Sequence, residues 1–322
     1  MDDNDNNDDI ILLGANDNVT DDMILPFVLQ ESNLRGRVVR LGDVLDHILV
    51  PHAYPMPVAQ MTGESVTLSL LLGGMLKYDG VFTLQAQGSG PVRLVVADLT
   101  SDGSVRGMAA FDPDQLGHIL NNSGDVVGLR ATDSVFDLKT LMGDGYLSFT
   151  VDQNNGADRY QGIVALEALD LATAVQNYFR QSEQIETILK VACGQVDGHF
   201  RAGGIMIQRL PLSPDALPSD MDMAQDHWNR ARAFLDTCMR DELIRTGLPA
   251  TDLLYRLFHE DGVKVFNPIA VRKGCRCSVE KLYGILSRMS ESDRTDMTVE
   301  GKITMHCEFC SKDFAFDPAS LS

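Results

Sequence analysis

Four of the six cysteines in this chain lie near its C-terminus, in two short pairs. Cys275 and Cys277 form a CxC pair, and Cys307 and Cys310 form a CxxC pair about thirty residues further on. Zinc prefers tetrahedral sulfur ligands, and four thiolates leave no coordination position open for water. The spacing therefore predicts one closed, structural Zn²⁺ site, which would not itself catalyse hydrolysis.

The same four thiols are candidates for oxidation. Zinc-bound sulfur is deprotonated, and the thiolate is the form that reacts with peroxide or exchanges with disulfides. Oxidation to disulfides would remove the ligands and release the metal. Structural zinc contributes about 10–16 kcal/mol to small domains, against about 5–15 kcal/mol for the whole stability of an ordinary domain. Loss of the metal is therefore expected to unfold the C-terminal tail.

Cysteine spacing by itself leaves two interpretations open, an inert structural zinc site and a redox sensor. A thioredoxin-type oxidoreductase is a weaker third, because its CxxC opens a helix near a βαβ unit and this CxxC follows a predicted strand. His306 is a minor candidate ligand, since four cysteines already complete the site. Cys193 and Cys238 stand alone, as small buried hydrophobic residues often do, and the sequence assigns them no role.

The chain has no other recognisable catalytic motif. Its remaining histidines follow no metal-ligand or triad spacing, and it contains no P-loop, no GxGxxG opening a helix and no GxSxG elbow. These observations favour a protein that is not an enzyme.

Composition narrows the partners and the compartment. The chain has 322 residues, 44% of them hydrophobic and 23% charged, which is typical of a soluble globular protein. Its net charge of -19 argues against nucleic-acid binding, which requires a basic face. The N-terminus is acidic rather than a basic signal peptide, and the apolar stretch at 66–76 is too short to span a membrane. We expect a cytoplasmic protein without a membrane partner, in which disulfides would be transient.

The elements that position the cysteines divide into four predicted segments. Residues 1–22 carry eight aspartates and no Lys or Arg, so we expect a disordered acidic leader. Residues 23–210 predict a sheet-rich α+β core domain with a buried helix at 58–77, in which a closely packed sheet would explain Gly73 and Gly74. Asp170 is the expected N-cap of a helix at 171–183. Further strands are predicted at 23–41, 82–86, 92–97, 105–111, 146–152, 160–166, 188–193 and 204–210, and a short helix at 44–50.

Residues 211–270 predict a helical linker, for which the family resemblance described below implies redox sensitivity. A proline-rich stretch at 211–218 precedes a long amphipathic helix to about residue 246, with Ser219 and Asp222 as its capping box, and a short helix follows at 252–258. Residues 271–322 form the predicted zinc domain. It has a helix at 279–289 and a strand at 302–306, and Phe314 and Phe316 are expected to pack over the metal site.

At these residues the chain resembles the 33 kDa chaperonin, or heat shock protein 33, family of redox-regulated bacterial chaperones. Besides the CxC and CxxC, the resemblance is carried by Met305 and His306 before the second pair. Upstream it is carried, in order, by TLMGDGY at 140–146, RYQG at 159–162, YFRQSEQ at 178–184 and AGG at 202–204. It covers nearly all of the chain after about residue 22.

The resemblance implies a holdase chaperone that works without ATP and is inactive while reduced and zinc-bound. Oxidation would pair Cys275 with Cys277 and Cys307 with Cys310, release the zinc and unfold the linker. The exposed apolar surface would then bind unfolding client proteins, and the oxidised form would be a homodimer. The alternative is an acidic protein-interaction module whose zinc site is inert and which docks one fixed partner.

Overall fold

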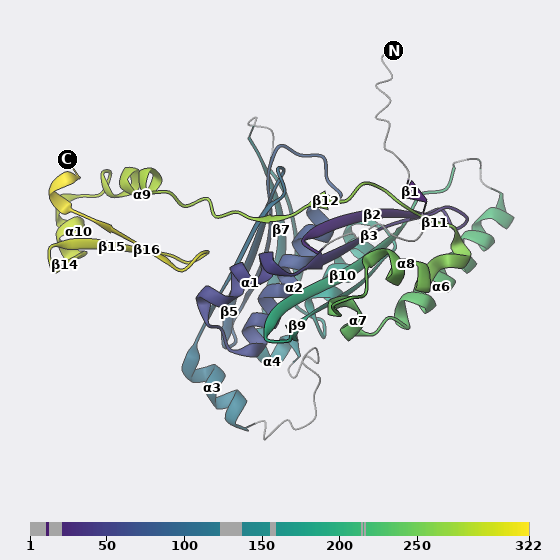
Figure 1. Cartoon of the computed structure of the whole chain (residues 1–322), viewed down its shortest axis with the longest axis horizontal. Coiled ribbons are helices and arrows are strands. Elements are labelled where there is room, and N and C mark those ends of the chain that lie inside the picture. The colour runs from purple at the N-terminus through teal and green to yellow at the C-terminus, as the bar shows by residue number, and fades with distance from the viewer. Residues whose placement is uncertain are drawn as a thin grey trace, which may run out of the picture.

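The computed structural model describes residues 11–12, 21–122, 137–154, 159–213, 215 and 217–321. Most of the predicted acidic leader, residues 1–10 and 13–20, lies outside the described residues. Two sheets lie on either side of one central helix, and a small C-terminal module projects from one end of this core (Figure 1). The predicted α+β class with a buried helix is confirmed.

The first sheet has seven strands among the described residues. Its order is β1 (Ile11–Leu12), β11 (Val263–Val265), β2 (Met23–Leu29), β3 (Leu34–Leu41), β10 (His199–Arg209) and β9 (Thr187–Val196), and β12 (Ile269–Ala270) also pairs with β2. All of its pairs are antiparallel. Two linker strands, β11 and β12, therefore extend a sheet that begins with the N-terminal hairpin.

The second sheet runs β13 (Arg272–Lys273), β6 (Ser104–Phe111), β5 (Val92–Thr100), β4 (Gly80–Gly88), β7 (Gly145–Gln153) and β8 (Tyr160–Ala165). Its pairs are antiparallel except for β13, which lies parallel to β6. The segment that leads to the CxC is thus hydrogen-bonded to the edge of this sheet. The strands predicted for the core domain are all present, with ends shifted by a few residues.

The central helix α2 (Met56–Gly73) contacts both sheets and is buried from Val58 to Gly73. Its buried hydroxyl groups, on Thr62, Ser65, Thr67 and Ser69, donate to backbone carbonyls one turn earlier, so none lacks a partner. A Cβ on Gly73 would lie 2.9 Å from Leu99 Cδ2, which confirms that a closely packed sheet requires glycine there. The helix ends at Gly73 rather than at the predicted residue 77.

Shorter helices flank the sheets. The predicted helix at 44–50 is α1 (Asp43–Leu49), followed by the turn η1 (Val50–His52). Asp170 caps α5 (Leu171–Tyr178) as predicted, accepting from Thr173 N at 2.7 Å, and the helix continues as a π-turn, η2 (Phe179–Glu183). Two helices, α3 (Pro113–Asn122) and α4 (Leu138–Met142), were not predicted.

The linker folds as α6 (Pro218–Asp236), α7 (Arg240–Ile244), α8 (Ala250–Phe258) and the turn η3 (His259–Asp261). The predicted single helix to residue 246 is wrong, because the chain turns at Thr237 so that the Cys238 side chain can enter the apolar core. The predicted capping box is also wrong. The helix begins at Pro218, whose fixed φ suits the first helical position, and Leu217 N donates to Asp220 Oδ2 at 2.9 Å.

The linker covers the outer face of the first sheet. Leu34 and Val38 of β3, with Ile205 and Ile207 of β10, face away from α2 and share one core with the linker helices. The linker contributes its own buried side chains to this core, among them Trp228, Ala231, Leu235, Leu243, Leu253, Leu254, Leu257 and Phe258. Met221 on α6 and Met239, the N-cap of α7, lie outside this core and are exposed.

The C-terminal module contains α9 (Val279–Leu286), α10 (Glu291–Asp296), β14 (Thr298–Val299), β15 (Lys302–Cys307), β16 (Lys312–Phe316) and η4 (Pro318–Ser320). The predicted helix and strand are present as α9 and β15. Leu286, Ile303 and Phe316 pack together in a small core. The expected position of Phe316 over the metal site is wrong, because it pairs with Ile303 at the far end of the hairpin from Cys307.

Candidate metal centre

The structure brings the four predicted cysteine sulfurs together. Cys275 Sγ lies 3.2 Å from Cys277 Sγ and 3.6 Å from Cys307 Sγ, and Cys277 Sγ lies 3.5 Å from Cys310 Sγ. All four sulfurs lie within 4.8 Å of one another. Among the residues that the structure describes, no other group of three or more His, Cys, Asp or Glu side chains could hold a metal ion.

Two turns deliver the sulfurs. The CxC lies in the non-helical segment between β13 and α9, where Ser278 caps the helix by accepting from Lys281 N. Cys307 ends β15, and its carbonyl accepts from Cys310 N at 3.2 Å and Ser311 N at 2.8 Å. Ser311 adopts a positive φ of 52°, which folds the chain back into β16. The tight turn places Cys310 beside Cys307.

The donor set fits a soft divalent metal. Four sulfurs around zinc, each about 2.3 Å from the ion, form a tetrahedron with edges of about 3.8 Å. The sulfur separations of 3.2–3.6 Å are close to that edge and longer than an S–S bond of about 2.05 Å. All four thiols are free, and Cys310 is buried while the other three are half-buried.

The crowding of the thiols favours one thiolate among them. Burial opposes ionisation of Cys275, but hydrogen bonds from the Cys277 amide and the neighbouring thiols lower its pKa to about 7. Burial raises the pKa of Cys277, and the neighbouring thiols raise it further. Burial also raises the pKa of Cys310. A bound cation would displace the remaining thiol protons, since metal ligation requires thiolates.

The other sequence candidates lie elsewhere. His306 Nδ1 lies 2.7 Å from Asp313 Oδ1 and is outside the sulfur group. Cys193 and Cys238 are both fully buried. Burial raises the pKa of Cys193, and it raises that of Cys238 to about 11. These two thiols are packing residues rather than ligands.

His52, a core residue that the sequence did not single out, holds the CxxC turn. His52 Nε2 lies 3.4 Å from the Phe309 carbonyl oxygen, and His52 Nδ1 lies 2.9 Å from Ser311 Oγ. This pattern suits a neutral ring that donates from Nε2, and burial lowers the pKa of His52 accordingly. No spacing in the sequence links His52 to the turn.

A buried carboxylate joins the CxC to the second sheet. Asp98 on β5 accepts from Arg106 Nε on β6 at 2.8 Å and from the guanidinium of Arg276 within the CxC. The Arg106 guanidinium also lies 3.6 Å from the centre of the Phe309 ring. The cross-strand pair of Asp98 and Arg106 could have been found from the hairpin register, but its contact with Arg276 could not.

Core side chains also fix the linker helices. Lys190 Nζ on β9 donates to the carbonyls of Leu235 and Asp236 at the end of α6, at 3.3 and 3.0 Å. Arg240 on α7 pairs with Glu64 on α2, whose pKa is raised by burial. Positive side chains that meet the carbonyls at a helix C-terminus stabilise it. The linker is therefore held by polar contacts as well as by apolar packing.

Among the described residues, no helix is both long and apolar enough to cross a membrane.

Comparison with known proteins gives consistent matches. The family model described as Hsp33 protein matches residues 22–317. The 33 kDa chaperonin of Caulobacter vibrioides (strain NA1000 / CB15N) is 38% identical over 305 residues, covering 93% of this chain and 96% of its own. That of Ectopseudomonas mendocina (strain ymp) is 35% identical over 298 residues, covering 92% of each chain. The crystal structure of the 33 kDa chaperonin (heat shock protein 33 homolog) from Thermotoga maritima has the same fold, with a TM-score of 0.74 at 22% identity, over 93% of this chain and 96% of its own.

Proposed function

The chain belongs to the Hsp33 family of chaperones, and from that membership we propose that it is an ATP-independent holdase that oxidation switches on. The observation that carries the proposal is the group of four free thiols in a C-terminal module that contacts the core through Arg276 and Ser311. In this proposal the protein is cytoplasmic and is not an enzyme.

The four thiolates of Cys275, Cys277, Cys307 and Cys310 are the proposed ligands of one Zn²⁺. Their chemistry and separations support zinc over harder cations, which prefer oxygen. The bound metal supplies folding energy, which the module needs because its own core is small. Among the described residues of the module, that core contains four buried apolar side chains, Leu286, Ile303, Phe316 and Leu321.

Oxidation removes these ligands. At each cysteine pair, one hydrogen peroxide accepts two electrons from the two thiolates and two protons from solvent, so that one S–S bond and two water molecules form. We propose the pairs Cys275–Cys277 and Cys307–Cys310. The short distance between the CxC sulfurs supports the first pair, and the family resemblance supports the second.

Release of the module is then transmitted to the linker. We propose four units: an acidic leader at 1–22, a core domain at 23–210, a linker at 211–270 and a zinc domain at 271–322. Unfolding of the zinc domain breaks the contacts of Arg276 with Asp98 and of Ser311 with His52. The linker loses this anchor, leaves the first sheet and uncovers Leu34, Val38, Ile205 and Ile207. That apolar face binds unfolding clients, and it also offers a surface for an oxidised homodimer.

The test is a client-aggregation assay with and without peroxide, in which a chromogenic chelator reports zinc. The expected result is that suppression of aggregation rises as about one zinc per chain is released. Equal suppression in both states, or zinc release without any gain, would contradict the switch. One stoichiometric partner together with indifference to peroxide would instead support an acidic interaction module with an inert zinc site. Turnover in an insulin-reduction assay would support an oxidoreductase.

A further inference from the structure

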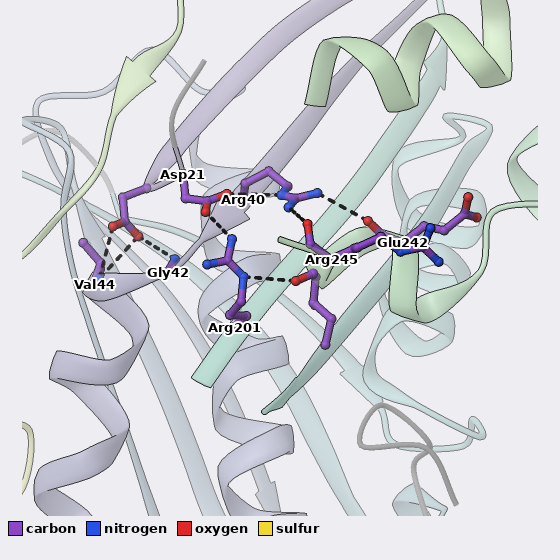
Figure 2. Close-up of polar contacts among 9 residues, drawn as sticks. Asp21, Arg40, Gly42, Val44, Arg201, Glu242 and Arg245 are labelled. Carbon is purple, nitrogen blue, oxygen red and sulfur yellow. Dashed lines mark hydrogen bonds and ion pairs between the residues drawn. The ribbon is translucent and has the colours of Figure 1, made fainter. Parts of the chain in front are cut away.

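Asp21 lies where the first sheet meets the linker, just before β2. Its Oδ1 accepts from Arg40 Nε on β3 at 3.3 Å, and its Oδ2 accepts from the guanidinium of Arg201 on β10 (Figure 2). The side chains of Arg40 and Arg201 are only 4% and 12% exposed. One carboxylate thus bridges two nearly buried guanidinium groups.

The same two arginines hold the end of linker helix α7. Arg40 donates to the carbonyls of Glu242 at 3.3 Å and Arg245 at 2.5 Å (Figure 2), and Arg201 Nε donates to the carbonyl of Ile244 at 3.0 Å. These carbonyls lie at the C-terminal end of α7, where no further helical turn supplies donors. The arginines therefore bind the C-terminal end of α7 and hold it against the first sheet.

Two neighbouring, nearly buried guanidinium groups require an anion close by. Burial lowers the pKa of Arg40, and Arg201 lowers it further while Asp21 opposes both effects. Without Asp21, two guanidinium groups would share a poorly solvated site with backbone carbonyls as their main partners. Asp21 thus stabilises the charges that bind the linker, although it does not contact the linker itself.

Asp22 fixes the position of Asp21. Its Oδ1 accepts from the backbone N–H groups of Gly42 at 2.8 Å and Val44 at 3.3 Å (Figure 2), and its carbonyl accepts from Val271 N at 2.8 Å. Val271 opens the segment that leads to the CxC. The N-terminal segment also contacts the linker directly, because β1 pairs with β11, Ile11 opposite Val265 and Leu12 opposite Lys264.

We propose that Asp21, Arg40 and Arg201 form an ionic latch that holds α7 on the core. In this proposal Asp21 controls how readily the linker dissociates from the first sheet. The latch would regulate the proposed chaperone switch, so its regulatory role rests on that proposed function. The neutral, nearly isosteric change Asp21→Asn opens it without altering the cysteines.

The test is amide hydrogen exchange of the reduced, zinc-loaded full chain. Asp21→Asn is expected to exchange about tenfold faster than the unchanged protein at residues 242–245, because charge-assisted hydrogen bonds are lost at a partly exposed carboxylate. Amides of β4 and β5 should keep their rates. Asp21→Glu, which retains the charge, should lie closer to the unchanged protein than Asp21→Asn. Asp114→Asn, an exposed aspartate in the first turn of α3, is the matched control and should have no effect.

Unchanged exchange at residues 242–245 in Asp21→Asn would overturn the latch. Equal acceleration in β4 and β5 would overturn it as well, because it would mean a general loss of stability. Peroxide activation separates the two proposals. If the unchanged protein gains no aggregation suppression on oxidation while Asp21→Asn still loosens α7 locally, the switch fails and the latch stands. If the unchanged protein is activated normally and α7 is not loosened, the latch alone fails.

Discussion

At the scale of single residues, the environment of each thiol decides its chemistry. Cys193 and Cys238 are enclosed by apolar side chains, and burial raises the pKa of both, so they remain protonated and inert. The other four cysteines crowd one another on two turns, and the pKa of Cys275 falls to about 7. The same residue type is therefore packing material in one place and a candidate metal ligand in the other.

Removal of one sulfur tests the ligand assignment. Cys307→Ser is expected to lower zinc affinity steeply and to leave the C-terminal module unfolded, because three sulfurs cannot complete the tetrahedron and the small core does not hold by itself. Zinc per chain is measured on the purified protein, and folding of the module is followed by amide exchange. Cys238→Ala is the matched control and should retain one zinc. An unchanged stoichiometry in Cys307→Ser would refute the assignment.

At the scale of elements, the break between α6 and α7 lets the linker dock on the core. The turn at Thr237 buries Cys238, brings Lys190 to the end of α6 and directs Arg240 of α7 toward Glu64 of α2. A single straight helix could not make all three contacts. The ion pair is nearly enclosed, with side-chain exposures of 29% for Arg240 and 11% for Glu64. Loss of one partner is therefore costly.

Arg240→Ala is expected to weaken linker docking by about 3 kcal/mol near neutral pH, because it leaves a buried carboxylate without its cation. Burial already raises the pKa of Glu64 above its ordinary 4.5, and loss of the arginine raises it further. A raised carboxyl pKa favours the folded state at low pH and penalises it as pH rises through the folded value. The loss of stability, measured by denaturant unfolding, should be larger at pH 8 than at pH 5.

The double variant Arg240→Ala, Glu64→Gln is the control for this experiment. It removes the uncompensated charge, so it should regain part of the lost stability. It should also remove most of the difference in stability loss between pH 5 and pH 8. A single variant as stable as the unchanged protein at both pH values would show that the pair does not hold the linker.

At the scale of the whole molecule, the C-terminal module is small and stands at one end of the core (Figure 1). Its polar contacts with the core include the Arg276 bond to Asp98, the Ser311 contact with His52 and the Lys273 bond to the His47 carbonyl. Arg276 and Ser311 are direct neighbours of the cysteines in the sequence, so a local change at the sulfurs can release the whole module. Docking and metal binding should therefore be separable.

Arg276→Ala is expected to loosen the docked module while it keeps its zinc, because the change removes the bond to Asp98 and leaves all four sulfurs. Amide exchange at residues 52–54 and 308–311 should rise by several fold, and the zinc content should stay at one per chain. Arg288→Ala, an exposed arginine of the same module, is the matched control. Loss of zinc in Arg276→Ala would mean that the arginine supports the metal site itself rather than docking.

Much of this molecule follows from the sequence alone. Cysteine spacing predicted which sulfurs meet, because two short turns constrain their sulfurs locally. Alternation and turn residues predicted the strands, and a helix apolar on nearly all sides could only be central. The resemblance carried by the motifs at 140–146, 159–162 and 178–184 predicted the family, which the comparisons confirm.

Tertiary structure decided what joins distant segments. Asp21 and Arg201 are 180 positions apart and Asp98 and Arg276 are 178 apart, so no local periodicity could reveal their pairing. The break at Thr237 likewise depends on where the first sheet presents its apolar face and the cation of Lys190. Local spacing fixes turns and faces, whereas ion pairs between separate elements exist only once the chain has packed.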